Sequence, residues 1–525
     1  MKRIEKIIAA FALTLVVSAC NYLDVEVSNV VLEEYYYENV TQCQEALDGV
    51  YAVLNEGALY ANNMLGRMGL SADIGYEYYK SDQSGVGYYK TTVTDPKVFS
   101  YWSKCYVGIA RANSLLANID NIQSNALEYK RIKGEALFLR GYYYYMLAKR
   151  FGGVPLVLKP VEDISSQEKY AEQATLEEVY EQIVKDMEEA ADLVDKTEAA
   201  SEGWKVYQTT VWGMLTRVCL NMAGQPLART DMYEVAARYA QKVVDSGMHA
   251  LNPSFEQIFI NYAQKVFDIK ESMWEVNFWG DGTGLYATSG MVGRNIGVPS
   301  SATSPIGYCG GFLRVNPKLY YLYDETDKRR DWTINNFTYS SDGIKVYMTS
   351  LGRLSDRYCA KYRREYELPS STKQPSATDI NFPLLRYSDV LLMYAECYAY
   401  APESADANLA YEYLNMVRRR GHGVDIYTPS EYDFTDQSLA ALQQEIQNER
   451  ARELAYEMLR KDDLCRWGNF YTEMVAAGSF IVGSDTMAER AALTAYTHVR
   501  ARDELWPIPG RELSTNPKLT QNPGW

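Results

Sequence analysis

The stretch RGYYYYMLAKRFGGVPL, residues 140–156, decides what kind of fold the 525-residue chain adopts. It places four tyrosines in a row and then ends on Phe-Gly-Gly-Val-Pro. Flat aromatic rings can stack on sugars, so the run belongs either to a binding surface or to the packing of a core. Successive helical residues are turned by about 100°, so Tyr142 to Tyr145 would point all around a helix and could not form one flat platform. We therefore interpret the run as scaffold, in a helix that lies between other helices.

Apolar side chains extend this helix toward the N-terminus. From Ile132 they return at Ala136, Leu139, Tyr143 and Met146, which is the spacing of one broad buried helix face. Comparable stripes recur in LEEVYEQIVKDMEEAADLV, VYQTTVWGMLTRVCLNMAG, PLLRYSDVLLMYAECYAYAP and ANLAYEYLNMVRRRG. Many of them end on glycine or proline, as helices do. The sequence therefore predicts a predominantly α protein.

Fragments of the tetratricopeptide pattern indicate how these helices pair. Trp212 and Leu215 have the W-x2-L spacing, and Ala136, Gly141 and Tyr144 match further positions of the pattern. Residues 277–313, by contrast, are rich in glycine and have almost no helical periodicity. We therefore predict a tetratricopeptide-like helical-hairpin scaffold with an irregular loop-rich part and a few short strands, and such long irregular segments often carry function.

The N-terminus, MKRIEKIIAAFALTLVVSAC, has the pattern of a secretory signal. Lys2, Arg3 and Lys6 precede an apolar run that is too short to span a bilayer. The residues VSAC resemble a bacterial lipobox, in which Cys20 becomes the acylated first residue of the mature chain. We expect residues 1–19 to be removed and acyl chains on Cys20 to anchor the protein stably to a membrane.

Charge and cysteine content exclude several classes of function. The formal net charge is −15, and removal of residues 1–19 takes away three basic residues and one acidic residue. So acidic a surface repels phosphates and argues against nucleic acid. Neutral sugars should bind more readily than polyanionic ones, although a local patch can override the net charge. Neither a disulfide framework nor a zinc site is indicated by the scattered remaining cysteines, which we expect to be mostly buried thiols: Cys43, Cys105, Cys219, Cys309, Cys359, Cys397 and Cys465.

Four blocks of the sequence together resemble one known family. They are IKGEALFLRGYYYYMLAKRFGGVPLV, NFPLLRYSDVLLMYAECYA, ERARELAYEMLRKDDLCRWG and the closing LWPIPGRELSTNPKLTQNPGW. They look like the signature blocks of the SusD/RagB family of outer-membrane lipoproteins and occur in the order of that family. The resemblance spans the chain from Cys20 to Trp525, so we expect residues 20–525 to form one body with a loop-rich insert at about 271–383.

The resemblance carries expectations about function. It implies a nutrient-binding lid over a SusC-like TonB-dependent transporter barrel in the outer membrane, with glycans as the usual ligand and peptides as a known exception. It implies no cofactor. The acidic residues Asp24 and Glu26 faintly resemble the export signals of surface lipoproteins, which agrees with a lipid-anchored protein that faces the cell exterior.

Two segments combine loop character with aromatic and hydrogen-bonding side chains, namely residues 71–90 and 277–314. Sugar capture needs rings that stack and planar polar groups that hold adjacent hydroxyls. The family's binding loops vary, so the resemblance fixes positions in the chain and not individual residues. The candidates for stacking are Tyr76, Tyr78, Tyr79, Tyr88, Tyr89, Trp279, Tyr286 and Tyr308, and those for hydroxyl groups are Asp73, Asp281, Arg294 and Asn295. Of these we favour Trp279, and we interpret nearby Asn113 as structural.

The alternatives are catalysis and metal binding. The chain has three histidines without paired metal spacing, and GDGTG at 280–284 lacks the full dinucleotide-binding pattern. A glycoside hydrolase needs only two carboxylates, so it remains an outside alternative, although no pair stands out. The run DETDKRRD, residues 324–331, lacks the calcium-loop spacing, and we interpret it as surface charge. The charges of NERARELAYEMLRKDD, from residue 448, are interpreted as a solvated or ion-paired helix face.

Overall fold

A computed structural model describes residues 37–80, 82–120, 126–160, 170–278, 289–368 and 377–525. The predicted fold class is confirmed, because the described residues contain sixteen α-helices and only short strands. The longer helices are α2 (Val40–Tyr51), α3 (Pro96–Ile119), α4 (Leu127–Phe151), α5 (Leu176–Leu193), α6 (Gln208–Ala223), α7 (Met232–Asp245), α8 (Phe255–Gln264), α11 (Tyr387–Tyr400), α12 (Ala407–His422), α13 (Leu439–Glu453), α15 (Phe470–Gly478) and α16 (Met487–His498). The shorter ones are α9 (Pro317–Leu322), α10 (Arg329–Thr333), α14 (Arg460–Arg466) and α17 (Gly510–Thr515).

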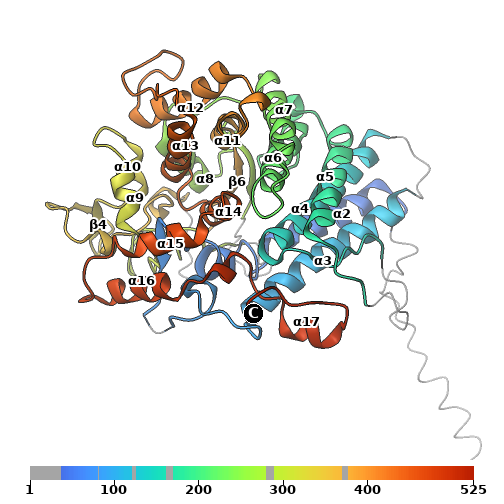
Figure 1. The fold of residues 1–525 in the computed structure, drawn as a ribbon, viewed down its shortest axis with the longest axis horizontal. Helices are drawn as coiled ribbons and strands as arrows, with labels where there is room; N and C mark the ends of the chain where they lie inside the picture. Colours follow the sequence, from blue (N-terminus) through green and yellow to red (C-terminus); the bar gives the residue numbers. More distant parts are fainter. Residues whose placement is uncertain (1–36, 81, 121–125, 161–169, 279–288, 369–376) are drawn as a thin grey trace, which may run out of the picture.

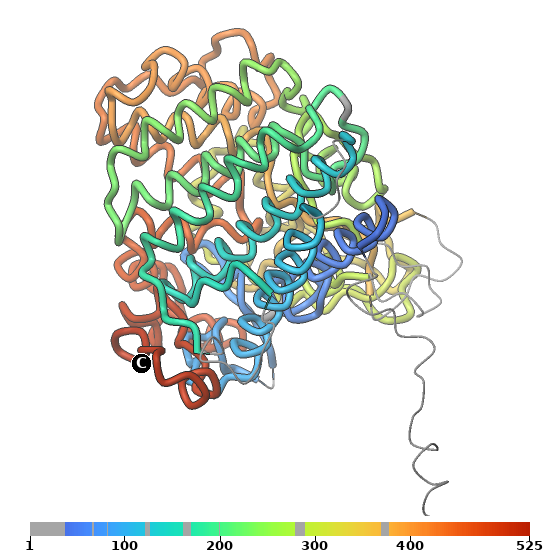
Figure 2. Tube along the Cα trace, turned by 90° about the vertical axis from the view of Figure 1, so that its right-hand side faces the viewer, coloured from blue at the N-terminus to red at the C-terminus, as the bar shows by residue number. Residues whose placement is uncertain are grey.

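The long helices pack in chain order, as a tetratricopeptide-like scaffold requires. Helix α4 packs between α3 and α5, α6 packs against α5 and α7, and α11 joins this series to α12 and α13. Figure 1 shows the resulting arc, from α3 at the lower right to α13 at the top, and Figure 2 shows its helices side by side from another direction. Helices α9, α10, α15 and α16 lie on the opposite side of the molecule (Figure 1).

The tyrosine run of α4 is buried on every side, which confirms its interpretation as scaffold. Tyr142, Tyr143, Tyr144 and Tyr145 are each 2% exposed or less. Their hydroxyls reach four different neighbours, because the helix turns each ring in a different direction. The four partner atoms are Tyr60 Oη at 2.5 Å, Val50 O at 2.7 Å, Val157 O at 2.8 Å and Asn221 Nδ2 at 3.1 Å, in that order along the run.

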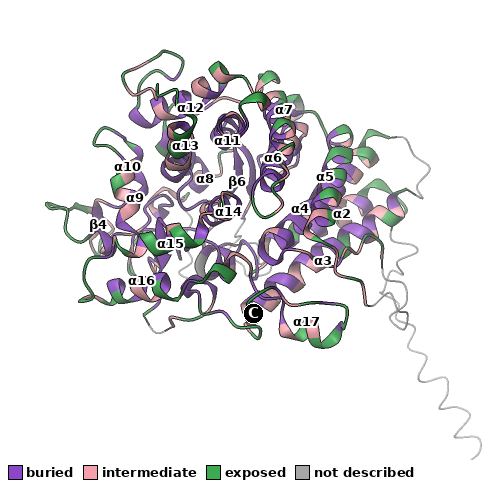
Figure 3. Cartoon of the chain, viewed as in Figure 1, coloured by how far each residue is buried: buried purple, intermediate pink, exposed green. Residues whose placement is uncertain are grey.

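Glycine lets α3 approach this run closely. A Cβ atom on Gly108 of α3 would lie 2.4 Å from the ring of Tyr143, so any larger side chain would push the two helices apart. Figure 3 shows how buried positions gather along the central helices, of which α11 is an example with nearly all residues buried. Six of the seven described cysteines are also buried and free, as expected, and Cys465 is partly exposed.

Short strands hold the loop-rich part together in three two-stranded antiparallel sheets of the described chain. They are β1 (Gly75–Glu77) with β3 (Leu313–Val315), β2 (Ser272–Val276) with β6 (Phe382–Arg386), and β4 (Phe337–Tyr339) with β5 (Lys345–Tyr347). Pairing of β2 with β6 brings together the two ends of the chain segment between them. The loop-rich segment therefore leaves the helical body and returns to it at one place.

The C-terminal tail docks on the body, as its two tryptophans predict. Trp506 is 2% exposed, and its ring packs edge-on against Tyr101 and Phe151, with centroid distances of 5.1 and 5.8 Å. The guanidinium of Arg502 lies 4.3 Å from the ring centroid of the last residue, Trp525.

A buried group of charges, which we call the central ion network, joins the helical scaffold to the loop-rich part. Glu453 of α13 accepts from Arg420 of α12 at 2.7 Å and contacts Arg386 of β6 at 2.8 Å and Arg329 of α10 at 3.1 Å. Glu449 pairs with the same Arg329 at 2.6 Å. All five side chains are 2% exposed or less. Further members are Glu271, Asp327, Lys361 and Glu457.

The central ion network corrects two sequence interpretations. The charges of α13 do form ion pairs, but in the core and not on a solvated face. The run at 324–331 is not simply surface charge either, because Asp327 and Arg329 are 3% and 1% exposed and pair with each other at 2.7 Å. Only part of that run, including Asp324 and Glu325, is exposed. Amphipathic spacing alone does not distinguish an exposed charged face from a buried one that faces charges of another element.

Over the described residues, none of the helices has both the length and the apolarity that crossing a membrane would require.

Candidate functional site

A cluster of three side chains, Tyr78, Arg314 and Tyr358, lies beside the β1–β3 sheet. Antiparallel pairing puts Arg314 opposite Tyr76, and the backbone N–H of Tyr78 donates to Phe312 O at 2.8 Å just beyond the paired residues. An isolated β-bridge places Tyr358 beside Arg314 on the other side. The guanidinium carbon of Arg314 lies 4.7 Å from the Tyr78 ring centroid and 3.8 Å from that of Tyr358. We call this the Tyr–Arg–Tyr cluster.

All three side chains of the Tyr–Arg–Tyr cluster are only partly buried and keep unused hydrogen-bonding capacity. No described carboxylate lies within 4.0 Å of Arg314, whose Nη1 donates to Asp356 O at 2.6 Å while its buried Nε has no partner among the described residues. Neither tyrosine hydroxyl has a hydrogen bond to a described residue. Burial raises the pKa of Tyr358, so its hydroxyl is a neutral donor and acceptor near pH 7. The cluster thus offers rings, hydroxyls and a guanidinium, which is the chemistry of sugar binding.

Glycine shapes the backbone next to Tyr358. Gly311 has a φ of +59°, and a Cβ atom there would lie 2.5 Å from Cγ of Pro299 and 2.8 Å from the Tyr358 ring. Because a side chain would meet both a proline and this ring, glycine is what permits the loop at 307–312 to pass so close to the cluster.

A second cation–ring pair adjoins the cluster. The guanidinium carbon of Arg294 lies 5.4 Å from the ring centroid of Tyr308, and its Nη1 donates to Asn295 Oδ1 at 2.7 Å. Asn295 Nδ2 in turn donates to Asn62 Oδ1 at 3.0 Å. The Asn295 carbonyl accepts from the N–H of Phe312 at 2.7 Å, which fixes this pair beside the Tyr–Arg–Tyr cluster. The structure therefore brings together four predicted site residues, Tyr78, Arg294, Asn295 and Tyr308.

The predicted hydroxyl-binding residue Asp73 lies in the core. It is 0% exposed and accepts from Arg460 and Lys318 at 2.7 Å each. Burial alone would raise the pKa of Asp73, but these two cations outweigh it and lower the pKa to about 2. The expectation that Asp73 belongs to an exposed loop is therefore wrong, and its carboxylate oxygens serve the packing of α9 and α14.

Four predicted stacking residues are buried as well. Tyr76, Tyr79, Tyr88 and Tyr89 are between 0% and 8% exposed and form a small core with Phe470 of α15. Tyr76 donates to Ser355 O at 2.7 Å, and Tyr89 donates to Ser71 O at 3.0 Å. The sequence signal failed here because a loop rich in tyrosine looks the same whether its rings face solvent or pack against helices. We do not include these four in the proposed site.

Three further predicted residues, Trp279, Asp281 and Tyr286, lie outside the described residues and stay predictions, as does the lipid attachment at Cys20. Sequence reasoning missed Arg314 and Tyr358. Arg314 is the last residue of the predicted loop segment 277–314 and could have been found as an arginine in a loop. Tyr358 gave no signal, because its pairing with Arg314 depends on the fold. Asn113, interpreted as structural, is 1% exposed and donates to Val157 O at 2.7 Å.

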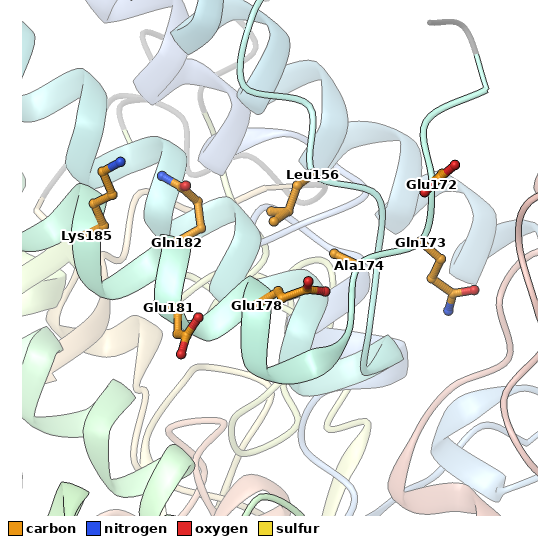
Figure 4. A pocket seen from close by; sticks show the side chains of 8 residues that line it. All are labelled: Leu156, Glu172, Gln173, Ala174, Glu178, Glu181, Gln182 and Lys185. Atoms are coloured by element: carbon orange, nitrogen blue, oxygen red, sulfur yellow. The ribbon is translucent and has the colours of Figure 1, made fainter. Parts of the chain in front are cut away.

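A hollow on the helical scaffold is a different kind of site. A cavity of about 500 Å³ lies along α5 and the strand-like segment before it, and Figure 4 shows the eight residues that line it. None of the described residues that line it is aromatic, and its Glu178 is engaged in a capping box with Thr175. It therefore lacks the stacking surface of the Tyr–Arg–Tyr cluster. Among the described residues no group of three or more His, Cys, Asp or Glu side chains could hold a metal ion.

Comparisons with known proteins agree on one family. A model of the SusD family matches residues 352–525, and a model described as starch-binding associating with outer membrane matches residues 21–220. SusD-like protein P2 of Formosa agariphila is 26% identical over 542 aligned positions, which span 100% of both chains. A SusD homologue from Bacteroides thetaiotaomicron superposes with a TM-score of 0.85 at 26% identity, over 94% of this chain and 98% of the other. Surface glycan-binding protein A from Bacteroides fluxus superposes with a TM-score of 0.70 at 22% identity, over 93% of this chain and 100% of the other.

Proposed function

Because the chain belongs to the SusD/RagB family, we propose that it is an outer-membrane lipoprotein that binds glycans at the Tyr–Arg–Tyr cluster and delivers them to a SusC-like TonB-dependent transporter. One observation carries the choice of site. Arg314 is partly exposed, lies between two tyrosine rings and has no carboxylate partner among the described residues. The names of structural neighbours such as surface glycan-binding protein A support a glycan as the ligand.

The cluster suits a neutral sugar. A pyranose has an apolar face that stacks on a ring and an edge of adjacent hydroxyls that a planar guanidinium can bind through two hydrogen bonds. Tyr78 and Tyr358 supply rings and hydroxyls, and Arg294 with Tyr308 repeats the combination nearby. Two such combinations side by side favour an oligosaccharide over a single sugar.

Replacing Tyr78 by Ala tests this assignment. An array of neutral oligosaccharides first identifies a ligand of the wild-type protein, and titration calorimetry then compares the variant. We expect affinity to fall by at least about tenfold, or about 1.4 kcal/mol, because a stacked ring is lost. The melting temperature should change little, since Tyr78 is only partly buried. Tyr321→Ala, at a tyrosine that is 65% exposed and outside the cluster, is the matched control and should bind normally.

Two results would contradict the proposal. If the wild type binds peptides and no glycan, then the same fold serves peptide uptake and the glycan assignment fails. If Tyr78→Ala lowers the melting temperature and leaves affinity unchanged, the ring belongs to packing, and the binding site must be sought elsewhere, first at Trp279.

The lipid anchor at Cys20 is a separate proposal with its own test. We expect Cys20→Ala to remain unacylated and to move from the detergent phase to the aqueous phase in detergent partitioning, because its acyl chains supply the membrane affinity. Its far-ultraviolet circular dichroism should match that of the wild type. Retention of the variant in the detergent phase without a lipid would show that something else holds the protein at the membrane.

A further inference from the structure

A second pocket lies beyond the Tyr–Arg–Tyr cluster, and none of the cluster's three residues lines it. Its volume is about 350 Å³. Its walls come from α9, α10, the residues after α10 and the segment that follows β5. The lining side chains that matter are Tyr320, Arg330, Asp331, Asn336 and Arg357.

Arg357 is an exception among the buried arginines that the structure describes. Thirteen arginines of the described chain are less than 9% exposed, and twelve of them have a carboxylate oxygen within 4.0 Å. Arg357 is 7% exposed and has no such partner among the described residues. Within the described chain its guanidinium donates only to backbone carbonyls, to Asn335 O at 2.7 Å, to Ser350 O at 3.3 Å and to Leu351 O. A charge that is removed from water is costly unless an opposite charge compensates it, so this guanidinium is suited to receive an anion.

Arg330 brings a second guanidinium to the same pocket. Its Nε donates to Asp331 Oδ1 at 3.0 Å, and its guanidinium carbon lies 5.2 Å from the Tyr320 ring centroid. Two arginines against one aspartate leave the lining with a net positive charge, although the whole chain carries −15. The two guanidinium groups therefore favour an anion at this place, in contrast to the net charge of the whole protein.

The rest of the lining is suited to a sugar. The Tyr320 hydroxyl and the Asn336 amide have no hydrogen bond to a described side chain, and the exposed residues Thr349 and Ser350 add hydroxyls. Arginine holds a carboxylate through paired hydrogen bonds in one plane, whereas a phosphate monoester, with a charge of about −1.5 to −2 at pH 7, would meet the nearby carboxylate of Asp331 with more negative charge.

We propose that this pocket binds the carboxylate of an acidic sugar residue, with Arg357 and Arg330 as its partners. The inference rests on the proposed glycan-binding function and adds that the saccharide carries uronic acid units. It also changes an expectation from net charge alone, since a local patch can bind an anion on an acidic protein.

The test uses the whole protein and one pair of probes that differ only in charge. Titration calorimetry compares tetragalacturonate with its fully methyl-esterified form, in which the sugar and its length are kept and the carboxylate charge is removed. We expect the acid form to bind at least about tenfold more tightly to the wild type, because the ester cannot form the charge-assisted pair. Arg330→Gln and Arg357→Gln should each reduce this ratio to below about threefold.

Controls separate binding from folding. Arg357 holds three backbone carbonyls, so its variant can disturb the local loop, and Arg330→Gln, which breaks no backbone contact of a described residue, keeps the test valid. Arg238→Gln removes an arginine from an exposed helical pair with Glu234 and should leave the ratio unchanged. Melting temperatures of all variants are measured alongside.

Four outcomes would overturn the inference. The first is equal affinity for the acid and the ester, and the second is an acid-to-ester affinity ratio that stays unchanged in both Arg330→Gln and Arg357→Gln. The third is that neither probe binds. The fourth is that the protein prefers a carboxylate only in peptides, binding those with a free C-terminus more tightly than amidated ones. In the third case the proposed function would still hold if the wild type binds a neutral oligosaccharide and Tyr78→Ala does not. The two proposals can therefore fail separately.

Discussion

Glu453→Gln is expected to be one of the two most destabilising single changes considered for this chain. We expect the free energy of unfolding to fall by about 3–5 kcal/mol, which is the cost of removing one partner from a buried ion pair. The reason is that the Glu453 carboxylate contacts three guanidinium groups, those of Arg329, Arg386 and Arg420, at 3.1, 2.8 and 2.7 Å. Glutamine keeps the size of the side chain, so the loss reports the charge and not a cavity.

Urea unfolding followed by circular dichroism measures this loss. Glu234→Gln is the matched control, since Glu234 pairs with Arg238 on an exposed helix surface with both side chains more than 60% exposed. Exposed pairs contribute about 0–1 kcal/mol, so the control should unfold nearly as the wild type does. Equal stability of Glu453→Gln and wild type would mean that water or rearranged side chains compensate the three arginines, and the central ion network would then not be what joins the loop-rich part to the scaffold.

The same network predicts how stability depends on pH. Burial would raise the pKa of Glu449, but Arg329 and Arg452 outweigh it and lower the pKa from 4.5 to about 2. Burial would also raise the pKa of Glu453, but Arg420, Arg386 and Arg329 outweigh it and hold this pKa well below its usual range. A depressed carboxylate pKa stabilises the fold above the unfolded-state value and loses that contribution as the pH falls toward the folded-state value. The wild type should therefore lose stability between about pH 5 and pH 2, and Glu453→Gln should lose less over the same range.

The helical scaffold could be predicted because its signal is local. Ile132, Ala136 and Tyr143 recur at helical spacing, and a helix that is apolar on all sides must lie between others. The structure confirms this at α4, where each tyrosine reaches a different neighbour. Signals of this kind depend on residues that are close in sequence and are the same wherever the helix is placed.

The site could be predicted only in part, because its contacts join distant segments. Tyr78, Arg314 and Tyr358 come from three parts of the chain, and nothing near Tyr358 in sequence indicates that Arg314 lies 3.8 Å from its ring centroid. Asp73 and Tyr76 have the composition of a binding loop, and yet both are 0% exposed. A polar aromatic loop faces water or packs on a helix depending on which other segment of the chain lies beside it. The composition of the loop does not contain that information. In the same way, only the structure shows that Arg357 has no carboxylate beside it among the described residues, whereas the other buried arginines of the described chain do.

The second large loss of stability is expected in the tyrosine run of α4, Tyr142 to Tyr145. Tyr143→Ala should lower the free energy of unfolding by about 3–5 kcal/mol, as truncation of a large buried aromatic side chain does. Tyr143 is 0% exposed, its ring faces Gly108 of α3, and its hydroxyl donates to Val50 O at 2.7 Å. Alanine would leave a void between α3 and α4 and also a buried carbonyl without its donor.

Two controls divide this loss into its parts. Tyr143→Phe keeps the ring and removes only the hydroxyl, so it should cost about 1 kcal/mol. Tyr427→Ala removes a ring that is 65% exposed, and its effect should stay within about 0.5 kcal/mol. Urea unfolding gives the three stabilities, and titration calorimetry of the folded proteins gives their affinities for the neutral oligosaccharide found on the array. Affinity should be the same in all of them, because we propose that the Tyr–Arg–Tyr cluster, and not the tyrosine run, binds the sugar. Wild-type stability of Tyr143→Ala together with lost binding would reverse that assignment and make the four tyrosines part of the site.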